Sequence, residues 1–175
     1  MRISIICVGK IKERFYTDAC AEYVKRLSKY TRLDIIELPD EKTYENASDT
    51  MVDAILNKEA GRILDKVPDQ AYVYATAIEG RTLDSVRFAR SIETLMTGGN
   101  SHIVFIIGGS LGLHDSVKRR ANELISFSAM TFPHQLMRVI LLEQIYRAFR
   151  IINNEPYHKS WYGFFSIWDQ KSCVL

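Results

Sequence analysis

The alternation of short apolar runs with amphipathic segments most limits how this chain of 175 residues can fold. Arg2–Val8 and His102–Ile107 are rich in β-branched and other apolar residues, with no regular alternation of polar positions. Strands of this kind occur in parallel sheets that helices cover on both faces. Because such strands alternate here with helical patterns, the sequence predicts an α/β fold built on a parallel sheet.

Helical periodicity and capping residues place most of the other elements. Glu13–Lys29 carries apolar residues at helical spacing. Ser48 is a suitable N-cap for a helix to about Lys66. Pro133 can open a last long helix to about Ile152, because its missing donor costs little at a helix start. We also predict strands at Leu33–Leu38, Ala71–Ala77 and Ile125–Phe127, and helices from Thr82 to Gly98-Gly99 and over Leu113–Leu124.

Composition excludes several classes of protein. The chain has 47% hydrophobic and 25% charged residues, as an ordinary globular domain does. It shows no signal peptide and no apolar stretch long enough to cross a membrane. The few, widely spaced cysteines (Cys7, Cys20 and Cys173) argue against a disulfide framework and favour the cytoplasm. No set of His, Cys, Asp or Glu has metal-ligand spacing, so we predict no metal.

The formal net charge of +2 does not by itself indicate a nucleic-acid partner. Its distribution leaves two interpretations open. Two basic segments, residues 1–39 and 115–159, flank an acidic segment at 40–70 and could form a surface that faces phosphates. The same pattern also fits solvated helix faces of differing charge.

A glycine-rich turn follows the apolar strand that ends at Ile107. Open α/β sheets bind ligands at the carboxyl ends of their strands. Gly108, Gly109 and Gly112 would let backbone amides approach a ligand closely. The spacing is not GxGxxG and no P-loop lysine follows, which disfavours a nicotinamide enzyme or an NTPase. A tight turn without a ligand is the alternative.

The same turn contains the Gly-x-Ser-x-Gly pattern of hydrolase nucleophile elbows, centred on Ser110. The possible partners of Ser110 in a triad are Asp115 or Glu123 and His134 or His158. Both carboxylates come too soon after the serine for that fold, and the chain is short for it. A turn residue bonded to its own backbone is the better interpretation of Ser110.

Two later segments also contain side chains suited to binding or catalysis. The small hydroxyl and aromatic residues of Leu124–Arg138 could surround an adenine, or they could simply pack a loop onto the core. In Glu155–Lys159 a histidine stands between a tyrosine and a lysine, a combination suited to proton transfer or phosphate contact. A lone surface histidine is, however, usually inert.

Together these segments resemble the bacterial family of large-subunit ribosomal RNA pseudouridine-N3 methyltransferases, of the SPOUT class. The resemblance covers residues 1–159, and its most specific stretch is Ser126–Gln135. It implies a SPOUT-type parallel sheet flanked by helices, with a deep trefoil knot near the carboxyl end. It also implies a homodimer with its active site near the interface. The implied reaction is methylation of a pseudouridine in 23S rRNA, on the assembled ribosome, by S-adenosylmethionine (SAM).

Site residues follow from the resemblance position by position. The implied SAM contacts are Thr76, Gly108, Phe127, Ser128, Ala129, Met130, Thr131 and Phe132. The family usually has leucine in place of Thr76. His158 is implied as the general base or proton relay for the N3 proton, with Tyr157 and Lys159 orienting the base or holding phosphate.

The chain continues beyond Lys159, where the family usually stops. We expect residues 1–159 to form one domain and residues 160–175 to be an atypical, aromatic-rich extension. The extension calls into question whether Tyr157, His158 and Lys159 can close over a substrate. A ribosome- or RNA-binding module that kept the fold and lost catalysis is the alternative function.

Overall fold

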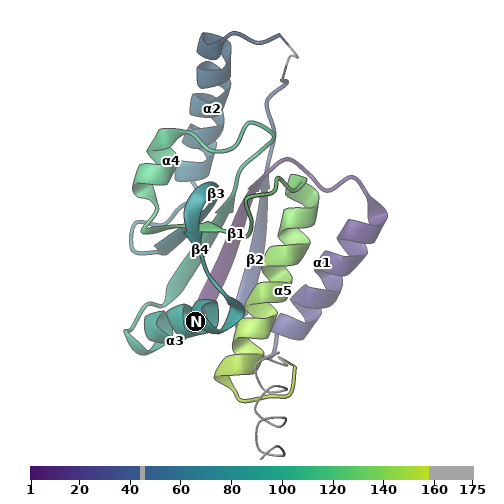
Figure 1. Cartoon of the computed structure of the whole chain (residues 1–175), viewed down its shortest axis with the longest axis vertical. Helices are drawn as coiled ribbons and strands as arrows, with labels where there is room; N and C mark the ends of the chain where they lie inside the picture. Colours follow the sequence, from purple (N-terminus) through teal and green to yellow (C-terminus); the bar gives the residue numbers. More distant parts are fainter. Residues whose placement is uncertain (44–45, 158–175) are drawn as a thin grey trace, which may run out of the picture.

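A five-stranded parallel sheet lies at the centre of the protein, with helices on both faces (Figure 1). The computed structural model describes residues 1–43 and 46–157. The strand order is β2-β1-β4-β3-β5. The strands are β1 (Arg2–Val8), β2 (Arg32–Leu38), β3 (Tyr72–Thr82), β4 (His102–Ile107) and β5 (Glu123–Ser126). The predicted α/β class and parallel sheet are confirmed; the trefoil knot stays a prediction.

The helices divide between the two faces of the sheet. The five helices of the described residues are α1 (Arg14–Leu27), α2 (Asp49–Leu64), α3 (Ser85–Thr97), α4 (Asp115–Arg120) and α5 (His134–Ile152). One apolar cluster joins α1, α3 and α5 to the sheet, and a second joins α2 and α4 to its other face. Successive β1 residues alternate between the clusters: Ile5 and Cys7 belong to the first, and Ile6 and Val8 to the second. Both faces of β1 are therefore covered, which explains its continuous apolar sequence.

Capping residues account for where the helices begin. The Ser48 hydroxyl accepts the Met51 N–H at 3.4 Å, so the predicted cap of α2 is confirmed. The predicted start of the next helix at Thr82 is wrong. The Asp84 carboxylate accepts the Arg87 N–H at 2.7 Å and starts α3 at Ser85. The helix after the glycine turn is shorter than predicted, because β5 already begins at Glu123.

Strand β3 has an irregularity that the sequence did not predict. We expected this strand to end at Ala77, but it continues to Thr82. Ile125 of β5 pairs with both Thr76 and Arg81, so residues 77–80 bulge out of the ladder. A Cβ on Gly80 would lie 2.6 Å from the backbone carbon of Ile125, so only glycine allows this close approach. We call residues 77–80 the β3 bulge.

The parallel arrangement brings the loops after the strands to one edge of the sheet. The glycine turn follows β4, the β3 bulge comes shortly after Ala75, the last β3 residue paired with β4, and residues 127–133 connect β5 to α5. This is the edge at which open α/β sheets bind ligands. None of the helices in residues 1–43 and 46–157 is both long and apolar enough to span a membrane.

Candidate functional site

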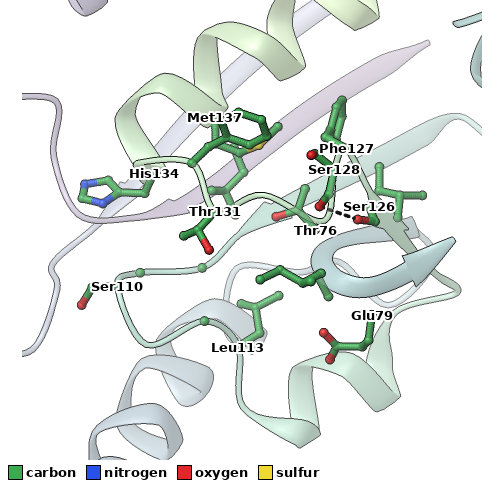
Figure 2. A pocket seen from close by; sticks show the side chains of 18 of the residues that line it. Thr76, Glu79, Ser110, Leu113, Ser126, Phe127, Ser128, Thr131, His134 and Met137 are labelled. Atoms are coloured by element: carbon green, nitrogen blue, oxygen red, sulfur yellow. Dashed lines mark hydrogen bonds between the residues drawn. The ribbon is translucent and has the colours of Figure 1, made fainter. Parts of the chain in front are cut away.

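A cavity of about 690 Å³ lies at the carboxyl ends of β3, β4 and β5 (Figure 2). Its wall comes from the β3 bulge, the glycine turn and the loop between β5 and α5. The size is that of a typical small-molecule site. The three segments lie far apart in the sequence, and the parallel sheet brings them together.

The glycine turn is shaped by contacts between its own backbone atoms. The Gly112 N–H donates to the Gly109 carbonyl at 3.1 Å, and Gly112 has a φ of +87°. A Cβ on Gly108 would clash with the Gly112 carbonyl, whose carbon would lie 2.7 Å away. Glycine at position 108 is therefore required by the turn itself, before any ligand is considered.

The loop between β5 and α5 is held by two serine side chains. The Ser126 hydroxyl donates to the Ser128 carbonyl at 3.1 Å (Figure 2), and the Ser128 hydroxyl accepts the Met130 N–H at 3.0 Å. Phe127 and Phe132 pack against the core, whereas Met130 is 74% exposed. The packing interpretation thus holds for the aromatic rings, and the loop also forms cavity wall. Contact with an adenine stays a prediction.

Seven of the eight residues that the resemblance implied for the cofactor line this cavity. They are Thr76, Gly108, Phe127, Ser128, Met130, Thr131 and Phe132. Ala129 lies in the same loop but is exposed and is not part of the wall. Thr76 donates its hydroxyl proton to the Ile106 carbonyl at 3.1 Å, which ties β3 to β4 where the family usually has leucine.

Sequence reasoning assigned no cofactor role to three polar residues of the wall: Glu79, Lys118 and His134. His134 had been considered only as a possible hydrolase base. Glu79 is placed by the β3 bulge and Lys118 by α4, and their side chains form an ion pair at 2.6 Å. The bulge gave no periodic signal, so the position of Glu79 could not be predicted.

His134 stands where α5 begins, with its ring close to Gly9. A Cβ on Gly9 would lie 3.0 Å from His134 Nε2, and Gly9 has a φ of +84°. Burial lowers the pKa of His134, and the nearby positive charge of Arg138 lowers it further. The imidazole is therefore neutral at neutral pH.

Arg138 is the most deeply buried charged side chain in the described chain, at 0% exposure. Its guanidinium donates to the Glu37 carboxylate and to the Gly9 carbonyl, and Glu37 also accepts the Ile11 N–H. These bonds join α5 to the ends of β1 and β2. The sequence signal for this role is an arginine with apolar neighbours on both sides, Met137 and Val139.

Among the described residues, the hydrolase triad does not form. The Ser110 hydroxyl lies 3.5 Å from that of Thr43, with no histidine bonded to it among the described residues. Asp115 and Glu123 instead form ion pairs, with Lys118 and Arg81 respectively. His158, the other base considered, lies outside the described residues.

Tyr157 does not line the cavity. Its hydroxyl donates to Glu143 Oε1 at 3.2 Å, on the middle of α5, and its ring packs against Tyr146. Burial raises the pKa of Tyr157 to about 12, so the phenol keeps its proton at neutral pH. His158 and Lys159, the other two implied catalytic residues, lie outside the described residues.

Comparisons with known proteins identify the family. The model for the family described as "Predicted SPOUT methyltransferase" matches residues 1–158. The chain belongs to the SPOUT methyltransferase family. Membership confirms the expected fold class and makes this chain a methyltransferase, an enzyme. Within this family, the cavity is the natural candidate for the methyl-donor site.

Relatives with specific names align over most of this SPOUT methyltransferase. The chain is 56% identical to Ribosomal RNA large subunit methyltransferase H of Bacillus cytotoxicus over 159 residues. It is 55% identical to the proteins of the same name from Bacillus thuringiensis and Streptococcus thermophilus. Each alignment covers 91% of this chain and 100% of the relative.

Proposed function

We propose that this methyltransferase transfers a methyl group from SAM to N3 of a pseudouridine in 23S rRNA, on the assembled ribosome. The names of its relatives support ribosomal RNA of the large subunit as the substrate class. The observation that carries the proposal is the cavity, because residues implied for SAM converge there from three separate segments. A ribosomal substrate implies that the protein works in the cytoplasm.

The cavity suits the chemical character of SAM. The aromatic and aliphatic side chains of Phe127, Met130 and Leu113 offer apolar contact, and Ser128 and Thr131 add small polar groups. The glycine turn exposes backbone where a Cβ would intrude. We propose that Gly108, Thr76 and the loop 127–132 hold the cofactor, with backbone groups reading the adenine edge. When bound, SAM supplies an electrophilic methyl group on a sulfonium.

The protein must also place the pseudouridine and remove the proton from its N3. Positioning the nucleophile in line with the methyl group accounts for much of the rate that such a transfer needs. We propose His158 as the group that accepts the N3 proton, with Tyr157 and Lys159 orienting the base or holding phosphate. The phenol of Tyr157 can only donate a hydrogen bond or orient at neutral pH, because its pKa is raised to about 12.

We further propose that the enzyme is a homodimer in which one subunit's tail completes the partner's cavity. Tyr157 is bonded to Glu143 and lies outside the cavity wall of its own chain. In addition, α5 keeps several apolar side chains only half-buried, among them Leu136, Val139 and Ile140. Such a surface is suited to a second copy. Light scattering that shows a monomer at micromolar concentration would contradict the dimer.

The proposed function can be tested with ribosomes from a strain that lacks the family enzyme. These ribosomes are incubated with the protein and SAM carrying a labelled methyl group, and the label is then mapped by nuclease digestion and mass spectrometry. We expect one methyl group, on N3 of a pseudouridine of the large-subunit RNA. Label in another RNA, or on another atom, would contradict the assignment.

A non-catalytic module of the same fold is the second candidate. Isothermal titration with SAM alone separates the two, because a catalyst must bind its methyl donor and a binding module need not. A folded protein that does not bind SAM would favour the module.

A further inference from the structure

Glu79 and Lys118 form a charged pair in the wall of the cavity. Their side chains meet at 2.6 Å, between Glu79 Oε1 and Lys118 Nζ. They are the two side chains of the described wall that carry a full charge at neutral pH, because His134 is neutral. The rest of that wall is apolar, hydroxylic or glycine. A ligand with two opposite charges therefore has one suitable place in it.

Rigid backbone positions both side chains. Gly80, next to Glu79, is pressed against the backbone of Ile125, and Arg81 is bonded to Glu123 of β5. The β3 bulge is thus held directly after Glu79. Lys118 lies on α4, directly after the glycine turn. Figure 2 shows Glu79 across the cavity from His134 and Ser110, so the charged pair marks one end of the site.

We propose that Glu79 and Lys118 bind the amino acid end of SAM. In this arrangement the ammonium of Lys118 binds the α-carboxylate, and the carboxylate of Glu79 binds the α-ammonium. The inference rests on the proposed function, since it assumes SAM as the ligand. It adds an assignment of ligand orientation, with the methionyl end at the β3 bulge and α4.

The charges of the pair match those of the ligand end. Glu79 and Lys118 are 55% and 29% exposed, and an ion pair that is open to water contributes little to stability. Opening it is therefore cheap, and both charges find an opposite partner in the zwitterion. A nucleotide with a phosphate chain would instead place several negative charges beside Glu79, so the pair also favours SAM over nucleotides.

The test compares two ligands that differ in this one group. S-adenosylhomocysteine carries the amino acid end, whereas methylthioadenosine has the same adenosine and thioether without it. Both are titrated calorimetrically into the full chain, wild type and variants. We expect Lys118→Met and Glu79→Gln each to lower the affinity for S-adenosylhomocysteine about tenfold, which is the effect of one lost charge-assisted hydrogen bond. Their affinity for methylthioadenosine should stay unchanged, and Lys118→Arg should restore most of the loss.

Decarboxylated SAM tests which side chain binds the ammonium of the ligand and which binds its carboxylate. It keeps the ammonium and lacks the carboxylate, so its binding should weaken in Glu79→Gln and stay unchanged in Lys118→Met. The matched control is the ion pair of Arg2 and Asp34, at 2.7 Å and similarly exposed. It lies where β1 and β2 begin, at the other end of the sheet. Asp34→Asn should change no affinity.

Each failure has its own meaning. A wild type that binds neither adenosine ligand nor SAM would contradict the proposed function itself. Suppose instead that the wild type binds these ligands, and that both variants lose affinity for S-adenosylhomocysteine and methylthioadenosine equally. The pair then merely shapes the wall, and the inference is wrong. Variants that bind S-adenosylhomocysteine as well as the wild type does would show an ordinary surface ion pair, which also overturns it.

Discussion

At its amino-terminal end α5 lines the cavity and is held by a buried arginine. Its carboxyl-terminal end leads to Tyr157 and is held by partly exposed ion pairs. The Arg138 side chain is 1% exposed, while those of Arg147 and Arg150 are 25% and 18% exposed. The first end adds His134 and Met137 to the cavity wall, directly after the loop between β5 and α5. The second supports the segment that leads to His158.

The difference shows why the predicted site divides into two groups. Residues implied for SAM gather at the amino-terminal end of α5, whereas Tyr157 follows its carboxyl-terminal end and bonds to Glu143 at its middle. One helix cannot bring its two ends together within a single chain. In the proposed dimer, a second subunit would join the proposed cofactor site to the proposed proton acceptor. The predictions below test this separation of roles.

The largest expected effect is on the chemical step. His158→Ala should lower the single-turnover methylation rate by about two to four powers of ten, the usual range for general acid–base catalysis, with SAM affinity unchanged. Mixing this variant with a Gly108 variant should restore about a quarter of the wild-type sites, because half of the reassorted symmetric dimers hold one intact site. No recovery on mixing would show that each chain uses its own tail.

Replacing Arg138 and Arg147 should lower the free energy of unfolding by different amounts. Arg138→Met should lower the free energy of unfolding by about 3 kcal/mol, because it leaves the Gly9 carbonyl and Glu37 without their buried partner. Arg147→Met, at the more exposed end, should cost about 1 kcal/mol. Urea unfolding measures both. Equal losses would contradict the distinction between the ends.

A methyl group on the glycine turn should affect both fold and binding. We expect Gly108→Ala to lower the free energy of unfolding by about 1–3 kcal/mol, because the Cβ meets the Gly112 carbonyl. SAM affinity should fall by at least about tenfold, since the turn must move. Gly61 of α2 is the control, with no atom within 4 Å of its added Cβ. Gly61→Ala should stabilise by about 0.4–1 kcal/mol.

The smallest expected effect is on how stability depends on pH, which should differ between His134 at the start of α5 and Tyr157 beyond its end. The pKa of His134 is lowered from 6.5, so the unfolded chain binds a proton first and stability falls as pH drops below 6.5. The pKa of Tyr157 is raised from 10 to about 12, so its contribution is complete below pH 10 and is lost as pH rises toward 12. In thermal unfolding, His134→Gln should flatten the acid slope and Tyr157→Phe the alkaline one.

The sequence predicted elements whose signal is local. Ser48 caps α2 and Gly98 ends α3 as expected, because a side chain or glycine acts on its own turn. The cavity residues were found through the family resemblance. The β3 bulge was missed, since it depends on Ile125 pairing twice with a strand more than forty positions earlier. Glu79 and Arg138 were missed for the same reason: their roles are fixed by distant partners.

The arginine that joins α5 to the sheet also sets when the cavity can exist. Its two bonds reach 101 and 129 positions back along the chain, to Glu37 and Gly9. Contacts of such separation form late, because long loops must close before the contact contributes. During synthesis on the ribosome, the bonds from Arg138 to the ends of β1 and β2 can form only after α5 has emerged. A nascent chain thus assembles this cavity only after α5 has been made.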